Sequence, residues 1–413
     1  MERYKEYMDS GVQWLGEIPS HWDCVQFRGL FKITKRIAGK TGYDVLAVTQ
    51  KGIKVKDVES NEGQIASDYS KYQLVDPGDF AMNHMDLLTG FIGISSQTGV
   101  TSPDYRVFKN VSPKANSKFY LYLFEMCYKQ RIFYGLGHGV SNKGRWRLPA
   151  PVQNKFCIPL PPLVEQERIV TYIESKISKI DEYIAGIKTE LDLYKELIES
   201  IIFSKDAKDS IIFTSWEDFF DNTWKTELGK GLFDEIEIKG VSTERFLAVT
   251  QDKGLIYKDV EGVNFVTAEK KETQKLVSPG EFVISLRSFE GGIEYSTIKG
   301  LVSPAYVVLR LKEKYNTKQY QMYFRFLFKS VPFVSRLNSI SDSMRDGKAI
   351  KFSDIKRFPF PIPSDEKLKE IAKLSNIYDI KKKAVEEKIK LLDEYKQRLI
   401  ADCVTGQVNV QNE

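Results

Sequence analysis

Two long segments of the chain carry hydrophobic residues that alternate three and four positions apart. Between residues 163 and 205 this series runs for more than five heptads, and Gln166 is its one polar member. Its positions are Leu163, Gln166, Val170, Ile173, Ile177, Ile180, Ile184, Ile187, Leu191, Tyr194, Ile198 and Ile201. Such spacing places one apolar stripe along a helix and is typical of a coiled coil.

The second segment, residues 365–403, repeats the pattern less regularly. Lys381 interrupts it and Ile389 stands one residue out of step. The expected stripe is Leu368, Ile371, Leu374, Tyr378, Lys381, Val385, Ile389, Leu392, Tyr395 and Leu399. A helix of this length cannot bury its stripe alone, so the simplest partners are the two helices themselves. The alternative is that each helix packs on its own neighbouring lobe.

The chain also contains one internal repeat. Residues 46–50 (LAVTQ) recur as residues 247–251, and residues 74–80 (LVDPGDF) recur as residues 276–282 (LVSPGEF). Further pairs are KDVE at 56 and 258, SPDY at 102 with SPAY at 303, and IPLP at 158 with FPIP at 360. Every pair is offset by 201 or 202 residues, which indicates a tandem duplication of a unit of about 200 residues.

Each copy begins with short β-branched or aromatic runs broken by Gly, Pro, Asn and Asp, a strand-rich pattern. An aromatic helix, a proline-rich stop and the long helix follow. The predicted fold class is α+β: two duplicated lobes separated by two long helices that form an antiparallel coiled coil with approximate two-fold symmetry. The predicted boundaries are 1–158 for the first lobe with an N-terminal arm, 159–207 for the first helix, 208–362 for the second lobe, 363–405 for the second helix and 406–413 for a C-terminal tail.

Composition narrows the class of protein. Of 413 residues 42% are hydrophobic, yet no run of about 18 apolar residues offers a membrane span. Four distant cysteines and three histidines form no metal-ligand spacing, so we expect no metal site, no disulfide framework and a cytoplasmic location. The net charge is +5, but residues 1–162 hold 21 basic and 15 acidic side chains, a local charge of +6. The positive charge is thus concentrated mainly in the first lobe.

No catalytic residue is predicted. The chain lacks a GxxxxGK[ST] phosphate loop, an Asn-Pro-Pro-aromatic methyltransferase motif, a nuclease acid cluster and a GxSxG nucleophile turn. Residues 133–139 (FYGLGHG) resemble the glycine loop that holds S-adenosylmethionine, but an aromatic helix precedes them and a basic segment follows. We therefore interpret them as a flexible loop that presents the basic segment.

Polar loops at equivalent lobe edges are the candidates for DNA contact. Glutamine can pair with adenine, threonine with either base type, and arginine with guanine O6 and N7. After the first strand of the repeat come Thr49, Gln50 and Lys51 in one copy and Thr250 and Gln251 in the other. After the strand that follows the Pro-Gly turn come Asn83 and His84 in one copy and Arg287 and Ser288 in the other. The threonine–glutamine pairs have an alternative role, which is to close a turn.

A second group of basic residues resembles a phosphate clamp. Lys143, Arg145 and Arg147 flank Trp146 in the first copy, and Arg345 and Lys348 occupy the equivalent place in the second. Arginine and lysine in a glycine-flanked loop can follow a DNA backbone without contacting bases. The alternative is an ordinary solvated basic surface.

At these residues the chain resembles the specificity subunit of type I restriction–modification systems over nearly its whole length. The resemblance lies in residues 10–22 (SGVQWLGEIPSHW), 74–80 (LVDPGDF), 101–105 (TSPDY), 158–168 (IPLPPLVEQER) and 391–404 before Thr405 and Gly406. The second copy departs from it, because it lacks the opening box and has EKLKE at residues 366–370 in place of EQER.

The resemblance implies two target recognition domains, each reading one half of a split double-stranded DNA site, on a subunit without an active site. It implies two modification subunits that methylate adenine with S-adenosylmethionine, and restriction subunits that use ATP and Mg²⁺, with no cofactor on this chain. Two similar docking surfaces follow, at Gln166 and Arg168 on the first helix and at Lys367 and Lys369 on the second, of which the first matches the family pattern better. The competing hypotheses are a self-contained DNA methyltransferase or nuclease, and a coiled-coil scaffold without a DNA role.

Overall fold

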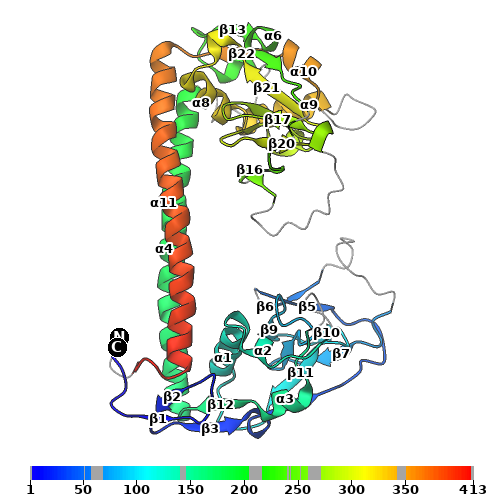
Figure 1. Ribbon diagram of the computed structural model, residues 1–413, viewed down its shortest axis with the longest axis vertical. Helices are drawn as coiled ribbons and strands as arrows, with labels where there is room; N and C mark the ends of the chain where they lie inside the picture. Colours follow the sequence, from blue (N-terminus) through cyan, green and yellow to red (C-terminus); the bar gives the residue numbers. More distant parts are fainter. Residues whose placement is uncertain are drawn as a thin grey trace. The chain divides into compact units, whose positions relative to one another are not determined.

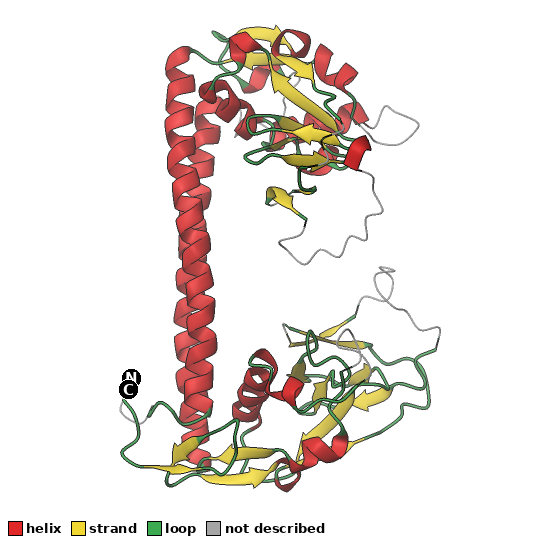
Figure 2. Cartoon of the chain, viewed as in Figure 1, coloured by secondary structure: helices red, strands yellow, loops and turns green. Residues whose placement is uncertain are grey.

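The computed structural model describes residues 2–50, 52–56, 68–139, 146–203, 216–239, 241, 243–251, 253–258, 271–341 and 350–410. The chain forms two units (Figure 1). Unit 1 comprises residues 1–184 together with 388–413, and unit 2 comprises residues 185–387. Both units mix helices and strands (Figure 2), so the fold class is α+β as predicted.

Unit 1 is built from short strands around one small antiparallel sheet with the order β4-β11-β8-β9. Two-stranded sheets β1-β2, β3-β12, β5-β6 and β7-β10 accompany it. The elements are β1 (Tyr7–Asp9), β2 (Glu17–Pro19), β3 (Asp23–Gln26), β4 (Phe31–Thr34), β5 (Leu46–Thr49), β6 (Gly52–Val55), β7 (Gln73–Val75), β8 (Phe80–Met82), β9 (Ile92–Ile94), β10 (Gly99–Thr101), β11 (Arg106–Asn110), α1 (Ser117–Lys129), α2 (Ile132–Gly135), α3 (Ala150–Lys155) and β12 (Cys157–Leu160).

Unit 2 repeats this topology. Its four-stranded sheet has the order β14-β21-β18-β19, and β13-β22, β15-β16 and β17-β20 match three of the two-stranded sheets of unit 1. The elements are β13 (Lys225–Leu228), α6 (Gly229–Leu232), β14 (Phe233–Glu235), β15 (Leu247–Thr250), β16 (Gly254–Tyr257), β17 (Lys275–Val277), β18 (Phe282–Ile284), α7 (Ser288–Gly291), β19 (Glu294–Tyr295), β20 (Gly300–Val302), β21 (Val307–Leu311), α8 (Lys318–Leu327), α9 (Val331–Ser341), α10 (Phe352–Arg357) and β22 (Pro359–Ile362). The duplication in the sequence is therefore a duplication of fold.

The repeated sequence motifs build the framework of each unit. A Cβ on Gly99 would lie 2.7 Å from Leu46 Cγ, and one on Gly300 would lie 2.6 Å from Leu247 Cγ, so β5 and β15 require glycine opposite them. The acid of each Pro-Gly turn is buried, and its carboxylate accepts a backbone N–H from the start of that turn. These acids are Asp79, which pairs with Arg36, and Glu281, which pairs with Arg310.

The long helices α4 (Leu163–Ile202) and α11 (Asp365–Val404) pack against each other within each unit (Figure 1). In unit 1 Lys396 contacts Asp181 at 2.9 Å and Lys388 contacts Tyr183, while in unit 2 Lys381 contacts Glu190 at 2.7 Å. Residue numbers rise along α4 as they fall along α11, so the pair is antiparallel, as predicted.

One position of the predicted stripe on α11 is wrong. Tyr395 is 44% exposed, whereas the neighbouring Lys396 is partly buried against α4. Leu392 and Leu399 on either side of Tyr395 are partly or fully buried as predicted, so only this position moves by one residue. The alkyl stem of Lys396 packs against α4. Hydrogen bonds from its ammonium to Asp181 and Asp393 offset the cost of partly removing that charge from water.

Both ends of the described chain lie in the core of unit 1. Residues 406–410, which the sequence analysis set apart as a tail, include the buried Val408 and Val410. Tyr7 donates to the carbonyl of Gly406 at 3.0 Å, and Asn409 N–H donates to the carbonyl of Glu2 at 2.9 Å. The β1-β2 hairpin of the N-terminal arm is thus tied to residues that follow α11.

Candidate DNA interface

Each β5-β6-type hairpin ends in a turn that carries the predicted threonine–glutamine pair. Thr49 Oγ1 donates to the carbonyl of Gly52 at 2.8 Å, and Thr250 Oγ1 donates to the carbonyl of Gly254 at 2.9 Å. The two threonines therefore close their turns, which was the alternative interpretation, and their hydroxyl protons are not available to a base. Gln50 and Gln251 are exposed beside them. Lys51 lies outside the described residues.

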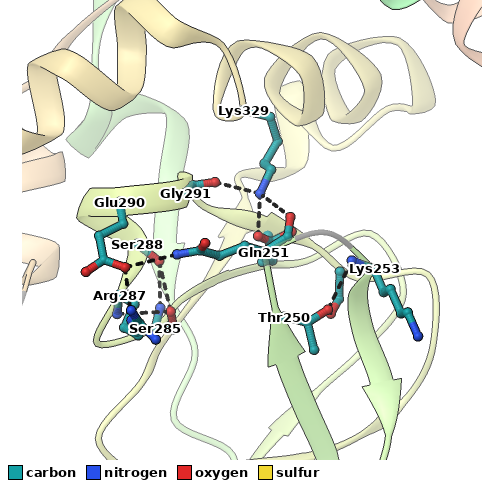
Figure 3. Close-up of polar contacts among 11 residues, drawn as sticks. Thr250, Gln251, Lys253, Ser285, Arg287, Ser288, Glu290, Gly291 and Lys329 are labelled. Atoms are coloured by element: carbon teal, nitrogen blue, oxygen red, sulfur yellow. Dashed lines mark hydrogen bonds and ion pairs between the residues drawn. The ribbon is translucent and has the colours of Figure 1, made fainter. Parts of the chain in front are cut away.

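In unit 2 the predicted candidates come together at one edge of the lobe (Figure 3). Gln251 Nε2 donates to Glu290 Oε2 at 3.3 Å, and Arg287 Nε donates to the same oxygen at 2.9 Å. The Arg287 side chain is 75% exposed. The structure thus brings Gln251 and Arg287, 36 positions apart in the sequence, to one acidic side chain.

Ser288 has a structural role and is wrong as a DNA contact. It is 1% exposed, and its hydroxyl oxygen accepts the backbone N–H of Ser285 at 2.8 Å. A serine at the first position of the short helix α7 is held there by the preceding turn. DNA cannot reach this side chain without opening that turn.

Lys329 fixes the hairpin turn to α7 and β19. Its Nζ donates to the carbonyl of Gln251 at 3.0 Å, to the carbonyl of Gly291 at 2.5 Å and to Glu294 Oε1 at 2.5 Å (Figure 3). An ammonium has three donors, and all three are used here. Lys329 is therefore a framework residue that supports the edge carrying Gln251 and Arg287.

A cleft of about 590 Å³ opens beside this edge, between the lobe of unit 2 and the helix pair of the same unit. Five basic and three acidic side chains line it, and the pair Arg325–Asp379 is joined by two hydrogen bonds of 2.8 Å. The charged residues are Lys195, Lys253, Arg325, Lys329, Lys382, Asp192, Glu294 and Asp379. The excess of basic groups suits a polyanion better than an apolar ligand.

In unit 1 the equivalent edge carries Asn83 and His84. Asn83 Oδ1 accepts the N–H of Met85 at 3.3 Å, and the backbone carbonyl of His84 accepts the N–H of Leu148 at 3.0 Å. Burial lowers the pKa of His84 to about 4, helped by the positive charges of Arg106 and Arg147. At neutral pH this imidazole is uncharged, so it can exchange hydrogen bonds with a base edge and adds no charge for a phosphate.

Of the predicted clamp, the described residues include Trp146 and Arg147. Arg147 is exposed, and its backbone exchanges two hydrogen bonds with His138, of 2.8 and 2.9 Å. Trp146 Nε1 donates to the carbonyl of Tyr134 at 2.7 Å, and its ring packs on Tyr134, so this indole belongs to the framework. Lys143, Arg145, Arg345 and Lys348 lie outside the described residues, and their role remains a prediction.

The four predicted docking residues on the helices fall into two groups. Arg168, Lys367 and Lys369 are exposed, and Lys367 pairs with Glu370 at 3.2 Å. Gln166 is 0% exposed, and its amide is bonded to the backbone of Lys114, Asn116 and Pro161 at 2.8–2.9 Å. A direct contact of Gln166 with another chain is therefore wrong, because every polar atom of the side chain is already used inside unit 1.

Glu290 and Lys329 were not among the residues predicted from the sequence. Glu290 stands three positions after Arg287, a spacing at which opposite charges pair on a helix, and this signal could have singled it out. Lys329 offers a weaker signal, because its contacts are mainly with backbone carbonyls. No sequence pattern shows which carbonyls a lysine will reach.

Three further observations concern the described part of the chain. It contains no group of three or more His, Cys, Asp or Glu side chains placed to hold a metal ion. None of its helices is both long enough and apolar enough to cross a membrane. The four cysteines form no disulfide.

The fold and the duplicated edge define a class: proteins with two copies of one α+β lobe joined to a pair of long antiparallel helices, as in type I restriction–modification specificity subunits. No protein-family model matches the chain. It is 20% identical over 440 aligned positions to the MjaX type I restriction enzyme specificity subunit of Methanocaldococcus jannaschii, and the match covers 96% of each chain.

One solved structure agrees in fold. A chain from a structure of the assembly and conformational transition of the type I restriction–modification system matches with a TM-score of 0.57 at 16% identity, covering 95% of this chain and 99% of that one. The HsdS subunit from Thermoanaerobacter tengcongensis matches with a TM-score of 0.41 at 15% identity, covering 95% and 98%. The resemblance expected from the sequence is thus confirmed: the chain is similar to type I specificity subunits over nearly its whole length.

Proposed function

We propose that the chain is the DNA-recognition subunit of a type I restriction–modification complex, and that each unit reads one half of a bipartite site. The observation that carries the proposal is one framework presented twice, with different side chains after the strand that follows the Pro-Gly turn. Gln50, Asn83 and His84 occupy the edge in unit 1, where unit 2 has Gln251 and Arg287. A protein that reads two different half-sites needs this combination of constant support and changed contacts.

The chemistry of these edges suits double-stranded DNA. Glutamine and arginine form the bidentate contacts that distinguish adenine and guanine in the major groove. Exposed Arg147 and the cleft residue Lys382 supply positive charge for phosphates, which position a protein without specifying sequence. Binding and reading are thus assigned to different residues.

The long helices are the proposed docking surface for two modification subunits. Outside the seam they expose apolar side chains one helical turn apart, Leu193 and Leu197 on α4 and Leu391 and Tyr395 on α11. Exposed apolar residues spaced by four positions fit an apolar groove or helix of another chain. Arg168, Lys367 and Lys369, which are exposed near the starts of the two helices, are proposed as separate charged docking contacts.

This chain is proposed to perform no chemistry itself. The similar proteins are named specificity subunits, and the motifs of methyltransferases and nucleases are missing from the sequence. S-adenosylmethionine, ATP and Mg²⁺ are assigned to the partner subunits, and no cofactor to this chain. Restriction subunits complete the proposed assembly.

The test is to express the chain with the modification subunits of its own system and to sequence the methylated adenines of the host genome. We expect methylation at two short, unlike sequences separated by a nonspecific gap, and none when this chain is omitted. Methylation by the chain alone with labelled S-adenosylmethionine would establish the competing hypothesis of a self-contained methyltransferase. Methylation that is independent of the chain would contradict the proposal.

A further inference from the structure

Glu290 contacts both of the exposed side chains that could read bases in unit 2. Its Oε2 accepts Arg287 Nε at 2.9 Å and Gln251 Nε2 at 3.3 Å. The two donors therefore lie no more than about 6 Å apart, which compares with a rise of about 3.4 Å per base pair. From the proposed function above, we infer that Glu290 is a positioning residue that holds Gln251 and Arg287 ready to read adjacent adenine and guanine in the second half-site.

The hydrogen bonds to Glu290 leave the reading atoms of both side chains available. Glu290 engages Nε of Arg287, which leaves the two terminal nitrogens for the fork toward guanine O6 and N7. Gln251 uses one of its two Nε2 protons, which leaves the other proton and Oε1 for adenine N7 and N6. An acid in this place orients the two readers without blocking them.

The backbone around the cluster is built for this contact. A Cβ on Gly291 would lie 2.7 Å from Gln251 Cγ, so glycine lets the glutamine lie against α7. Lys329 holds the carbonyls of Gln251 and Gly291 at 3.0 and 2.5 Å (Figure 3). The hairpin turn and the short helix thus form one rigid support beneath the two readers.

Unit 1 has the same strands beneath this edge but different residues in the loop between them. Strand β18 follows β8 by 202 residues, whereas β19 follows β9 by 201, so the loop between them is one residue shorter in unit 2. Counted from β8, Met85 and Leu88 stand where unit 2 has Arg287 and Glu290; counted from β9, Asp86 and Thr89 do, and neither pair joins a basic to an acidic residue. Leu88 is exposed. The charged cluster is therefore specific to unit 2, as a determinant of one half-site must be, whereas the repeated motifs beneath it are shared.

The test measures binding of the assembled methyltransferase to DNA carrying single-base changes across the site. Arg287→Ala should weaken binding to the cognate site roughly 5- to 150-fold and relax one guanine position, and Gln251→Ala should relax the neighbouring adenine. Glu290→Ala should cost about 10-fold, because two mobile side chains must then be ordered on binding, and should relax both positions. Glu290→Gln keeps an acceptor oxygen and should restore most of the preference.

A purely electrostatic role for Glu290 gives the opposite result. Removing a negative charge near DNA would strengthen binding to every sequence with the preference unchanged, and this outcome would overturn the inference. The matched control is Glu370→Gln, which removes an exposed acid that pairs with the basic residue three positions before it, Lys367 on α11, and should leave the preference intact. If the wild-type assembly shows no sequence preference, the proposed function fails instead. Equal thermal unfolding of the variants ensures that the differences come from recognition.

Discussion

The two long helices begin at equivalent places but are held by opposite chemistry. In unit 1 the buried amide of Gln166 bonds three backbone groups, and the adjacent buried Glu165 accepts hydrogen bonds from Tyr4 at 2.5 Å and His21 at 2.9 Å. In unit 2 the aligned positions are Leu368, which is 2% exposed in an apolar core, and the exposed Lys367. The first turn of α4 is thus held by polar contacts and the first turn of α11 by apolar ones, although both turns take the same helical form.

The exchange is possible because the surrounding backbone changed with it. Gln166 satisfies the N–H of Asn116, the residue before α1. Thr317 occupies the equivalent place before α8. Its N–H donates instead, at 2.8 Å, to the carbonyl of Tyr315, the last residue of the short 3₁₀ turn Glu313–Tyr315. Leu368 therefore leaves no buried donor without a partner. The comparison teaches that a duplicated framework tolerates polar-to-apolar exchange where the buried N–H that loses its side-chain partner gains a backbone one.

The largest expected change in stability comes from giving position 166 of unit 1 the leucine that unit 2 has at the aligned position 368. Gln166→Leu leaves the Asn116 N–H and the carbonyls of Lys114 and Pro161 without this partner, which should lower the free energy of unfolding by about 2–4 kcal/mol. Leu368→Met, which conserves volume in the apolar copy, should cost about 1 kcal/mol or less. Urea unfolding of the full chain measures both. Equal stability of Gln166→Leu and the wild type would show that the polar network contributes nothing.

The next largest change in stability is expected from the hydrogen bond that ties the N-terminal arm to α4. Tyr4→Phe removes a hydrogen bond to the buried carboxylate of Glu165, and a bond to a charged group contributes about 2 kcal/mol. Tyr395→Phe, which removes a hydroxyl from an exposed tyrosine on α11, serves as the control and should change stability by less than about 0.5 kcal/mol. Thermal unfolding compares the two. A similar small shift for both would mean that the arm is held by packing alone.

The pH dependence of stability should distinguish the units through His84. Burial lowers its pKa to about 4, from about 6.5 in an unfolded chain. The unfolded state then binds the proton more tightly, so stability is fully present above pH 6.5 and falls as the pH drops toward 4. Between pH 7 and pH 5 the wild type should lose about 1 kcal/mol more stability than the His84→Gln variant, a figure that allows for the partial exposure of the ring. His138→Gln, in an exposed position of the same unit, should keep the wild-type slope.

The smallest effect concerns Arg147. Arg147→Ala should weaken binding of the assembled complex to all DNA sequences alike and reduce the salt dependence by about one counterion. This contrasts with Arg287→Ala, which should change preference at one position. Binding to cognate and unrelated DNA at two salt concentrations separates the two behaviours. A change in sequence preference from Arg147→Ala would make it a reader and not a positioning residue.

Much of the fold could be predicted from the sequence because it depends on periodicity and repetition. The constant offset of 201 or 202 residues predicted two copies of one topology, and the apolar spacing predicted the helix pair. Tyr395 was placed in the stripe because a heptad count was continued past Ile389. Only packing against Asp181 shows that Lys396 takes that place.

The site was less accessible to sequence reasoning, because repeated residues proved to be framework. Thr49 and Thr250 recur because both hairpins need the same hydrogen-bonded turn. Gln166 was conspicuous as a polar residue in an apolar series, but nothing in the series shows the three backbone groups that surround it. Glu290 is not repeated, and its importance arises from Gln251, which folding alone brings to it.

The placement of both chain ends in unit 1 has a consequence for the order of folding during synthesis. Unit 2 is one continuous stretch, residues 185–387, and can complete its core once that stretch has emerged from the ribosome. The core of unit 1 includes Leu399, Val404 and Val408, which are made more than 200 residues after Ile184. Until then the first half of α4 has no α11 to pack against, and its apolar stripe is open to solvent. Unit 1 is thus the later unit to close, and the one that depends more on protection from aggregation.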